Sequence, residues 1–511
     1  MKQNKLYILF LGVFISMWLS SCDLDTKPST KVDEDSVMQD ARHFEKIITG
    51  SMVNLMESFY SLANPGYGAF LRADDAMGSD AVLNRKYGFS SHYSFTAIYG
   101  KGGTNTFSWN LTYQIINNMN IILRDIDNAQ GDEELKDRIK AQALAMRGFM
   151  YLHLASHYSF AINHDAKAVS VPIYTEKEEA YAPLAASSVA EVYAQVLSDI
   201  DTALDLLPEN YARAEKWQID RSVILGIAAR ASLYAREWEK AATYSDELLR
   251  NHSTSYLMNE KEYASGFNDL DNGEWIWGHA QRIDQDNASY QFHFLDTTSP
   301  DSYYYSFNVD PYFRDLFDEG DYRKAMIYWA PDPGKNPAEE EFVWMRYAKF
   351  KFKKDQIADV VLMRNSEIYL INAEAKAHLG EGDATHKLNA LKKARGAQLV
   401  QLSGDELLEE IYLERRKELF GEGFSLVDLI RLQKSVQRKE YPQSEKVEYT
   451  FQDETGASFT KLFTPQGHRI LNFPDKSEFT ANSKYYLYRI PDTEVRSNKL
   501  LYSKYPPLDI F

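Results

Sequence analysis

Residues Ile411–Gly423 of the 511-residue chain read IYLERRKELFGEG, and Asp428–Arg431 follow as DLIR. Acidic and basic side chains are interleaved through this stretch: Glu414, Arg415, Arg416, Glu418, Glu422, Asp428 and Arg431. Two carboxylates across an open cleft could cut a glycoside, but neighbouring arginines lower the pKa of an acid and so remove the required proton donor. We therefore predict a structural ion-pair network that closes the helix packing, and a glycosidase that uses Glu414 is the alternative.

Two helical hairpins are predicted from apolar periodicity, Ser222–Tyr234 with Glu239–Arg250 and Glu367–Leu379 with Ala384–Arg395. When one hairpin is laid over the other, small residues coincide: Ala229 with Ala373, Ala231 with Ala375, and Ala241 with Ala384. Small side chains at matching positions let helices approach closely, as in tetratricopeptide-type repeats. The pattern indicates a helical repeat, and coincidental antiparallel helices are the alternative.

Further helices are predicted nearer the N-terminus. Four helices are expected there. The first covers Asp40–Tyr60, and the second begins at Ser108 as N-cap and runs to Leu123. The third covers Ile139–Tyr158, and the fourth runs from Ser188 to Leu207. Residues 64–105 lack helical spacing and are rich in Gly, Ser and aromatic residues, and a loop of that length is uncommon unless it binds something. The helical scaffold is therefore expected over about 40–251 and 361–437.

Residues 252–360 separate the two hairpins and differ from them in character. Glu274–Gly278 alternates like a short strand, and tyrosines and Trp329 follow among many Asp, Asn, Gly and Pro residues. We predict a large irregular insertion that the scaffold carries. Residues 438–511 are expected to be irregular again, with strand-like patches such as Lys484–Ile490.

The Ile411–Arg431 stretch resembles the C-terminal hallmark of the SusD/RagB family, surface lipoproteins that hand nutrients to a TonB-dependent outer-membrane transporter. Other segments match the family in the same order: ALAMRGFMYLHLASHY at Ala143–Tyr158, FDEGDYR at Phe317–Arg323, RNSEIYLINAEAKAHLG at Arg364–Gly380, and Ile490-Pro491 with Glu494 and Asn498. Arg489 and Ser497 replace residues that are often proline in the family. The matches span nearly the whole mature chain.

This resemblance implies a mostly α fold in which about four tetratricopeptide-like helix pairs support an irregular, glycan-facing part with short strands. One such domain would span residues 40–511. The resemblance also implies a non-enzymatic protein that binds oligosaccharide or polysaccharide and acts as a lid on a SusC-like transporter. Binding of peptides or another nutrient in the same role, as RagB-like members imply, is the alternative.

The N-terminus predicts a lipid anchor. Leu6–Leu19 is an uncharged apolar run after a short positive start, and it is shorter than the roughly 20 residues of a membrane-spanning helix, as in a secretion signal. Leu19-Ser20-Ser21-Cys22 then resembles a bacterial lipobox, and Cys22 is the only cysteine of the chain. We expect residues 1–21 to be a lipoprotein signal peptide and residues 22–39 a lipidated tether. A secreted protein with a buried cysteine is the alternative.

The charge of the chain excludes some partners. It has 57 Lys and Arg against 74 Asp and Glu, a net charge of −17, and loss of residues 1–21 with two lysines and no acid makes this −19. A general nucleic-acid binder needs a basic face, so no nucleic acid is expected. Attachment to anionic lipid by charge is excluded as well, and the acyl chains on Cys22 would have to hold the protein on the membrane.

Aromatic residues outside the helices carry the ligand prediction. Tyr (34) outnumbers Phe (27), and flat rings bury area at low entropic cost while polar partners fix a sugar's hydroxyls. Two regions correspond to the family's sugar-binding regions, and their candidate residues are Asp80, Arg85, Tyr87, His92, Tyr93, Tyr99 and Asn105, followed by Tyr303, Tyr304 and Trp329. Packing beneath a loop is the alternative for any one tyrosine. Trp275 and Trp277 are predicted as strand residues, at least one of them in the core.

Two patterns raise the question of a metal. His153 and His157 stand at i and i+4, a spacing that can hold zinc, but no Glu occupies the metalloprotease position. We therefore predict histidines that pack between helices. The acidic turns Asp269–Gly273 and Asp284–Asn287 fail the EF-hand spacing, so structural calcium is only an alternative and no cofactor is expected.

The anchor prediction places the protein on the outer membrane at the cell surface. Asp23, directly after Cys22, retains some Gram-negative lipoproteins at the inner membrane, whereas in proteins that resemble this one an acidic stretch there accompanies export. Protease treatment of intact cells should therefore cut the chain together with known surface proteins. A chain that survives while those proteins are degraded would place it inside the cell.

Overall fold

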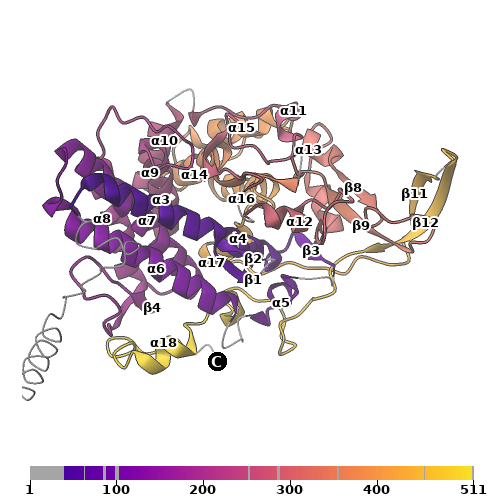
Figure 1. Cartoon of the computed structure of the whole chain (residues 1–511). Helices are drawn as coiled ribbons and strands as arrows, with labels where there is room; N and C mark the ends of the chain where they lie inside the picture. Colours follow the sequence, from indigo (N-terminus) through magenta and orange to yellow (C-terminus); the bar gives the residue numbers. More distant parts are fainter. Residues whose placement is uncertain are drawn as a thin grey trace, which may run out of the picture.

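The computed structural model describes residues 39–61, 64–84, 88–97, 103–250, 254–284, 288–353, 356–453 and 455–508. Long helices fill the left and centre of the molecule in Figure 1, and short strands lie at its right. The predicted mostly α fold is confirmed. The principal helices are α3 (Ala41–Glu57), α4 (Gly66–Ala76), α6 (Thr104–Asp125), α7 (Glu133–Tyr158), α8 (Val189–Leu206), α9 (Arg221–Ala235), α10 (Trp238–Leu249), α14 (Asn365–His378), α15 (Ala384–Ala394), α16 (Gly404–Glu418) and α17 (Ser425–Arg431).

Successive helices of the scaffold pack side by side. Helix α6 lies on α7, α7 on α8, α8 on α9 and α9 on α10, and α10 then packs on α14 although residues 252–360 separate them in sequence. The two predicted hairpins are confirmed as α9–α10 and α14–α15. Their matched alanines are all fully buried: Ala229, Ala231, Ala241, Ala373, Ala375 and Ala384. The insertion therefore leaves and re-enters the helical stack without interrupting it.

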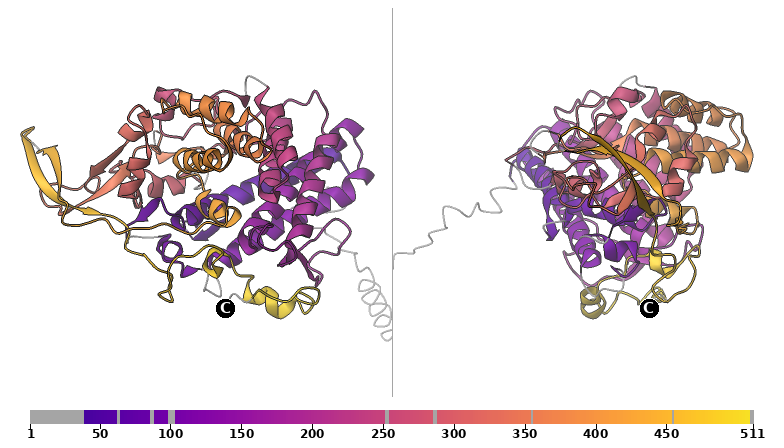
Figure 2. Two further views of the ribbon diagram at one scale, coloured as in Figure 1. Left: turned by 180° about the vertical axis from the view of Figure 1, so that it is seen from behind. Right: turned by 90° about the vertical axis from the view of Figure 1, so that its right-hand side faces the viewer.

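The strands are short and form small sheets. The predicted strand is confirmed as β6, which pairs antiparallel with β10 directly before α14 and so joins the two ends of the insertion; both of its tryptophans are buried. The largest sheet has the order β11-β12-β9-β8, and its β11–β12 hairpin projects beyond the body of the molecule (Figure 2). The strands are β1 (Phe59–Ser61), β2 (Asn64–Pro65), β3 (Ala81–Leu83), β4 (Val169–Pro172), β5 (Ala186–Ser188), β6 (Trp275–His279), β7 (Phe307–Val309), β8 (Ile327–Ala330), β9 (Phe342–Tyr347), β10 (Val360–Arg364), β11 (Val447–Gln452) and β12 (Ser458–Gln466).

The rest of the described chain is irregular apart from short helices. These are α5 (Ser90–Tyr93), α11 (Glu260–Tyr263), α12 (Phe292–Leu295), α13 (Tyr322–Ala325) and α18 (Asp492–Ser497), with 3-10 turns η2 (Ile126–Asn128), η4 (Ala288–Gln291), η5 (Pro311–Leu316) and η7 (Lys484–Tyr486). Among the described residues, no helix combines the length and the apolar character needed to cross a membrane.

The prediction of an irregular segment over residues 64–105 is wrong at α4. Ten of its eleven residues are buried, Arg72, Asp74 and Asp75 among them, so its polar residues do not mark a solvent-facing side. Gly66 and Gly68 also lower its intrinsic helix propensity. Gly66 opens it with a φ of +51°, and a Cβ at that position would lie 2.3 Å from the carbonyl oxygen of Met56. Close packing against α3 therefore explains both the glycine and the missing pattern.

Two further local predictions are corrected. Helix α6 begins at Thr104 rather than after Ser108, whose hydroxyl lies 2.9 Å from Nε2 of His153 on α7 and does not cap a helix. Lys484–Ile490 is not a strand: its first residues form η7, and the side chains of 485–488 are all buried. In both places a tertiary contact replaces the local role that the sequence suggested. The capping of α8 by Ser188 is confirmed, since Glu191 completes a capping box.

A buried ion-pair network connects the insertion to the scaffold. Glu418, the last residue of α16, accepts hydrogen bonds from three guanidinium groups: Arg323 at 2.6 Å, Arg364 at 2.5 Å and Arg395 at 2.8 Å. These arginines come from α13, the end of β10 and the residue after α15. Burial alone would raise the pKa of Glu418, but the three positive charges hold it well below its usual value.

The network is balanced in charge as well as buried. Five carboxylates and five cations at its centre are each at most 4% exposed: Glu274, Asp321, Glu414, Glu418 and Glu422 with Arg323, Lys349, Arg364, Arg395 and Lys417. At its edge a further pair, Lys392 with Glu410, reaches Glu414 through Lys392 and keeps the two signs in equal number. The ion-pair network predicted for the Ile411–Gly423 stretch is therefore confirmed. Removal of one charge from a buried network leaves its partners without compensation.

Glu418→Gln tests how much the fold depends on this network. The substitution keeps the size of the side chain but removes the charge that three arginines share, so we expect a loss of about 3–5 kcal/mol in the free energy of unfolding, measured by urea denaturation. Glu409→Gln is the matched control, because Glu409 is 65% exposed and pairs with Lys434 on the surface, which predicts a change below about 1 kcal/mol. Equal effects of the two changes would contradict a structural role for the network.

Candidate functional site

The second predicted aromatic cluster forms an exposed surface. Tyr303 is 58% exposed, and its ring stacks on the imidazole of His293, with ring centres 4.0 Å apart and planes 14° apart. Behind it, Tyr304 is half-buried and stacks on Phe294 at 4.5 Å, while its hydroxyl lies 3.1 Å from that of Tyr290. One aromatic face thus points to solvent and is supported from below by other rings.

Backbone hydrogen bonds fix this surface in place. The amides of Tyr304 and Tyr305 both donate to the carbonyl of His293, at 3.1 and 2.8 Å. The amide of Tyr303 donates to Nδ1 of the His293 ring at 3.2 Å. This bond requires an unprotonated Nδ1, and burial agrees with it by lowering the pKa of His293 to about 4. The support beneath Tyr303 is therefore a neutral ring at physiological pH.

Trp329 belongs to a separate aromatic group. It lies on β8, half-buried, with its ring 5.4 Å from Tyr441, which in turn is 5.4 Å from Tyr312. The ring contacts of the described residues do not join this group to Tyr303. Neither His293 nor Tyr441 was among the predicted site residues, and the sequence carries no local signal for them because their partners lie 10 or more positions away.

The first predicted cluster is largely below the surface. Asp80, His92, Tyr93 and Asn105 are all at most 6% exposed, so in this structure none of them presents its side chain to solvent. Asp80 forms an ion pair with Arg416 at 2.6 Å, and the Tyr93 hydroxyl lies 2.8 Å from Nδ1 of His468. Arg85, Tyr87 and Tyr99 lie outside the described residues, as does Cys22.

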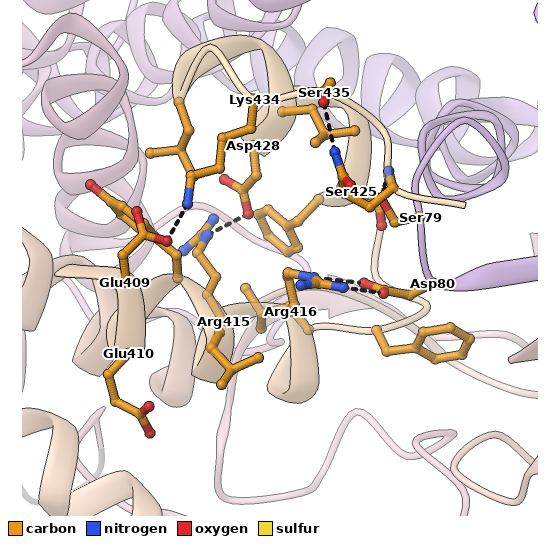
Figure 3. A pocket seen from close by; sticks show the side chains of 18 of the residues that line it. Ser79, Asp80, Glu409, Glu410, Arg415, Arg416, Ser425, Asp428, Lys434 and Ser435 are labelled. Atoms are coloured by element: carbon orange, nitrogen blue, oxygen red, sulfur yellow. Dashed lines mark hydrogen bonds and ion pairs between the residues drawn. The ribbon is translucent and has the colours of Figure 1, made fainter. Parts of the chain in front are cut away.

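A cavity of about 650 Å³ lies between α16, α17 and the segment that follows α17, with Ser79 and Asp80 at its edge (Figure 3). Six of its charged side chains are paired with one another: Arg416 with Asp80 at 2.6 Å, Arg415 with Asp428 at 2.7 Å, and Lys434 with Glu409 at 2.5 Å. Asp405, Glu406 and Glu410 also line the cavity, and Glu410 pairs with Lys392 outside it. The sequence did not predict this cavity, because its walls come from segments more than 300 residues apart.

Of the carboxylates considered for glycoside cleavage, Glu414, Glu418 and Glu422 do not line this cavity, and Asp428, which does, is paired with Arg415 and Arg431. Glu414 and Glu418 are fully buried on the other side of α16, within the ion-pair network. Burial would raise the pKa of Glu414, but the charges of Arg323 and Lys417 overcome this effect and hold it at about 2. An ionised, enclosed carboxylate offers neither the proton nor the water access that hydrolysis requires.

The two histidines considered for zinc are held by other groups. Nε2 of His157 lies 2.9 Å from the Asp74 carboxylate, and His153 lies against Ser108 and the rings of Tyr67 and Phe70. Burial lowers the pKa of His153 well below its usual value. The prediction of histidines that pack between helices is confirmed by these contacts. In the described ranges, no three His, Cys, Asp or Glu side chains gather as a metal site would require.

Comparisons with known proteins agree with this architecture. A family model described as "starch-binding associating with outer membrane" matches residues 24–233, and a model of the SusD family matches residues 340–506. The chain is 58% identical to a SusD-like carbohydrate binding protein of known crystal structure from Bacteroides vulgatus, with a TM-score of 0.89 over 92% of this chain and 99% of that chain.

More distant relatives share the fold. A SusD superfamily protein from Bacteroides thetaiotaomicron is 20% identical, with a TM-score of 0.72 over 90% of this chain and 99% of the other. A SusD-like protein from Formosa agariphila is 24% identical over 504 residues, which cover 85% of this chain and 93% of that protein.

Asp310, beside Asp80, gives a testable pH dependence. Burial, with the charge of Asp80 added, raises the pKa of Asp310 to about 7, and its Oδ1 has no hydrogen-bond partner among the described residues. The folded state therefore holds this proton more tightly than the unfolded state, so its contribution to stability is present below about pH 4 and is lost as the pH rises to about 7.

Asp310→Asn should remove the loss of stability that the Asp310 carboxyl causes as the pH rises. We expect the melting temperature of the variant to exceed that of the wild type by about 2 °C or more at pH 8, and the difference to shrink towards pH 4. Asp301→Asn, at an exposed position whose charge does not act on Asp310, is the control and should follow the wild-type pH profile. Parallel profiles for the wild type and Asp310→Asn would show that the carboxyl is already ionised in the folded protein.

Proposed function

The chain belongs to the SusD/RagB family, and on that premise we propose that it captures oligosaccharide or polysaccharide at the cell surface and delivers it to a SusC-like, TonB-dependent transporter. It would do so without catalysis. The lipid on Cys22 would tether it to the outer membrane, and the aromatic surface around Tyr303 would meet the glycan.

The observation that carries this proposal is the exposed Tyr303 ring on its neutral His293 support. A sugar presents flat C–H faces that stack on an aromatic ring, and a ring that is already held in place loses little entropy on binding. Because His293 is uncharged, the stack stays hydrophobic and unchanged across physiological pH. The similarity to a protein described as carbohydrate binding supports the same assignment.

Polar groups beside the ring can hold the sugar hydroxyls. Burial, together with the hydroxyl of Tyr304, raises the pKa of Tyr290, so its phenol stays protonated and can donate a hydrogen bond. A buried arginine fixes the same turn from below: Nη1 of Arg346 donates to the carbonyl of Tyr305 at 3.3 Å and to Oδ1 of Asn308 at 2.6 Å. The surface is thus largely preformed, as binding sites for small ligands usually are.

The absence of hydrolysis is part of the proposal. The carboxylates of the Ile411–Gly423 stretch form the buried ion-pair network, where their partners keep them ionised and solvent does not reach them. Sustained release of product from a glycan, abolished by Glu414→Gln in a protein that still folds, would instead establish the glycosidase alternative.

Isothermal titration with a panel of oligosaccharides (maltoheptaose, cellohexaose, xylohexaose and mannohexaose) tests the ligand class and the site. Tyr303→Ala and Trp329→Ala should each weaken the best ligand by roughly threefold to tenfold, the value of about 0.5–1.5 kcal/mol for a lost aromatic contact. The melting temperature should be unchanged in Tyr303→Ala and lower in Trp329→Ala, because Trp329 packs against the core, and circular dichroism should show that both variants are folded. Phe459→Ala, which removes a 49% exposed ring from the projecting β11–β12 hairpin, is the matched control and should bind normally.

Two results would contradict the proposal, one for the site and the other for the class of ligand. Wild-type affinity in both Tyr303→Ala and Trp329→Ala would show that the aromatic surface is not the glycan site. Binding of peptides together with no binding of any oligosaccharide would show that the chain takes a different nutrient.

A further inference from the structure

A second cavity, separate from the surface around Tyr303, has the side chains of a carbohydrate site. It encloses about 590 Å³ between α6, the connector 174–183 and α18. Figure 1 places α18 and β4 at the lower left and α12, whose His293 supports Tyr303, to the right of centre, so the two sites are separate. We propose that this cavity is a separate binding site for a neutral oligosaccharide, an inference that rests on the proposed function.

The floor of the cavity is a row of amides on one face of α6. Asn110, Gln114 and Asn117 all line it, and their spacing of four and three residues places them along a single helix face. At 1.5 Å per residue the row runs for about 10 Å, long enough to follow more than one sugar ring. Within the part of the chain that the structure describes, these three amide groups make no hydrogen bond.

Planar amides suit sugars because each presents two donors and an acceptor to neighbouring hydroxyl groups. On most surface helices such a row faces open water. Here the connector and α18 stand beside it and form an open cavity in which Asn110 and Gln114 stay exposed on the floor, with aromatic rings beside them: Trp109, Tyr113, Tyr174 and Tyr181. Binding sites for small ligands are usually largely preformed pockets of this composition, with aromatic walls and a few polar groups.

The opposite wall is held rigid by hydrogen bonds. The Tyr174 amide donates to the Tyr151 hydroxyl at 2.7 Å, and the Tyr174 hydroxyl donates to the carbonyl of Ala182 at 2.7 Å, which closes the connector into a loop. Asn120 on α6 and Asn498 after α18 donate to the carbonyls of Tyr174 and Leu184, at 3.0 and 2.8 Å. The connector is therefore tied to both other walls before any ligand arrives, which lowers the entropic cost of binding.

Tyr181 stands at the rim of this wall in an unusual conformation. Its φ is +61° and its side chain is 75% exposed. A left-handed backbone at a residue other than glycine costs about 1–3 kcal/mol and is concentrated at ligand clamps and switch regions. Packing does not explain the cost here, because the ring is mostly in water. A ring held at the mouth of a cavity is instead placed to stack on a sugar.

The charge of the cavity selects the kind of glycan. Glu178, Glu179 and Glu494 line it, against the single cation Arg124. Arg124 is itself paired with the neighbouring Asp125 at 2.8 Å. The excess of carboxylates repels uronic acids and sulfated sugars, and the −17 charge of the whole chain acts in the same direction. A neutral oligosaccharide is therefore the ligand class that fits.

The test uses the neutral oligosaccharide of the panel above that binds the wild type best, with oligogalacturonate as the acidic comparison. Titration of the full-length protein should give two sites, and the double variant Tyr303→Ala with Trp329→Ala should retain one of them. Adding Tyr181→Ala, or Asn110→Ala with Gln114→Ala, should weaken that remaining site at least threefold. Tyr181→Phe, which keeps the ring, should bind as before. Alanine is well tolerated on an exposed helix face, and a melting temperature equal to that of the double variant confirms folding.

The possible failures are distinguishable. A wild type with one site, lost in Tyr303→Ala with Trp329→Ala and unaffected by Tyr181→Ala, would overturn the second site and leave the proposed function intact. No binding of any neutral oligosaccharide by the wild type would overturn both. Tighter binding of oligogalacturonate at the Tyr181 site would overturn the assignment of a neutral ligand.

Discussion

Glu418 and the three guanidinium groups around it are the constraint on which the rest of this structure depends. Transfer of a charge from water into the interior costs several kcal/mol, and the attraction of its partners offsets that cost only when all of them are correctly placed. Arg323, Arg364 and Arg395 come from three different elements. The network is therefore satisfied only when α13, β10, α15 and α16 meet, which ties the insertion to the helical stack in one arrangement.

The aromatic surface around Tyr303, the proposed glycan site, depends on this arrangement through β9. Lys349, just after β9, joins the network by donating to Glu422 and to the carbonyls of Glu418 and Phe420. Three residues earlier, Arg346 holds the turn that carries Tyr303 and Tyr305. A short segment thus connects the buried charges of the scaffold with the exposed aromatic face. The buried ion pairs fix the position of β9, and β9 in turn fixes the turn that carries Tyr303. An insertion with little regular structure can therefore present a preformed aromatic surface.

Two separate glycan surfaces on one molecule would have a consequence for long ligands. A polysaccharide chain that reached both sites would bind the second one in an intramolecular step. Its overall affinity would then exceed the affinity of either site alone. Each contact alone could still release its sugar readily. A protein that must first capture a glycan and then pass it to a transporter benefits from such a division.

The sequence by itself identified the family, the helical hairpins, the strand at Trp275–His279 and the ion pairing of the Ile411–Gly423 stretch, because periodicity and alternating charge are local properties of a chain. It missed α4, whose polar residues are buried and therefore do not mark a solvent-facing side, and it could not separate exposed from buried candidates. Asp80 is buried against Arg416, 336 positions away, while Tyr303 is exposed on His293. The row of amides on α6 becomes a cavity floor only because the connector and α18 form walls beside it. Which side chains reach a ligand is decided by contacts between distant segments, and only the tertiary structure contains those.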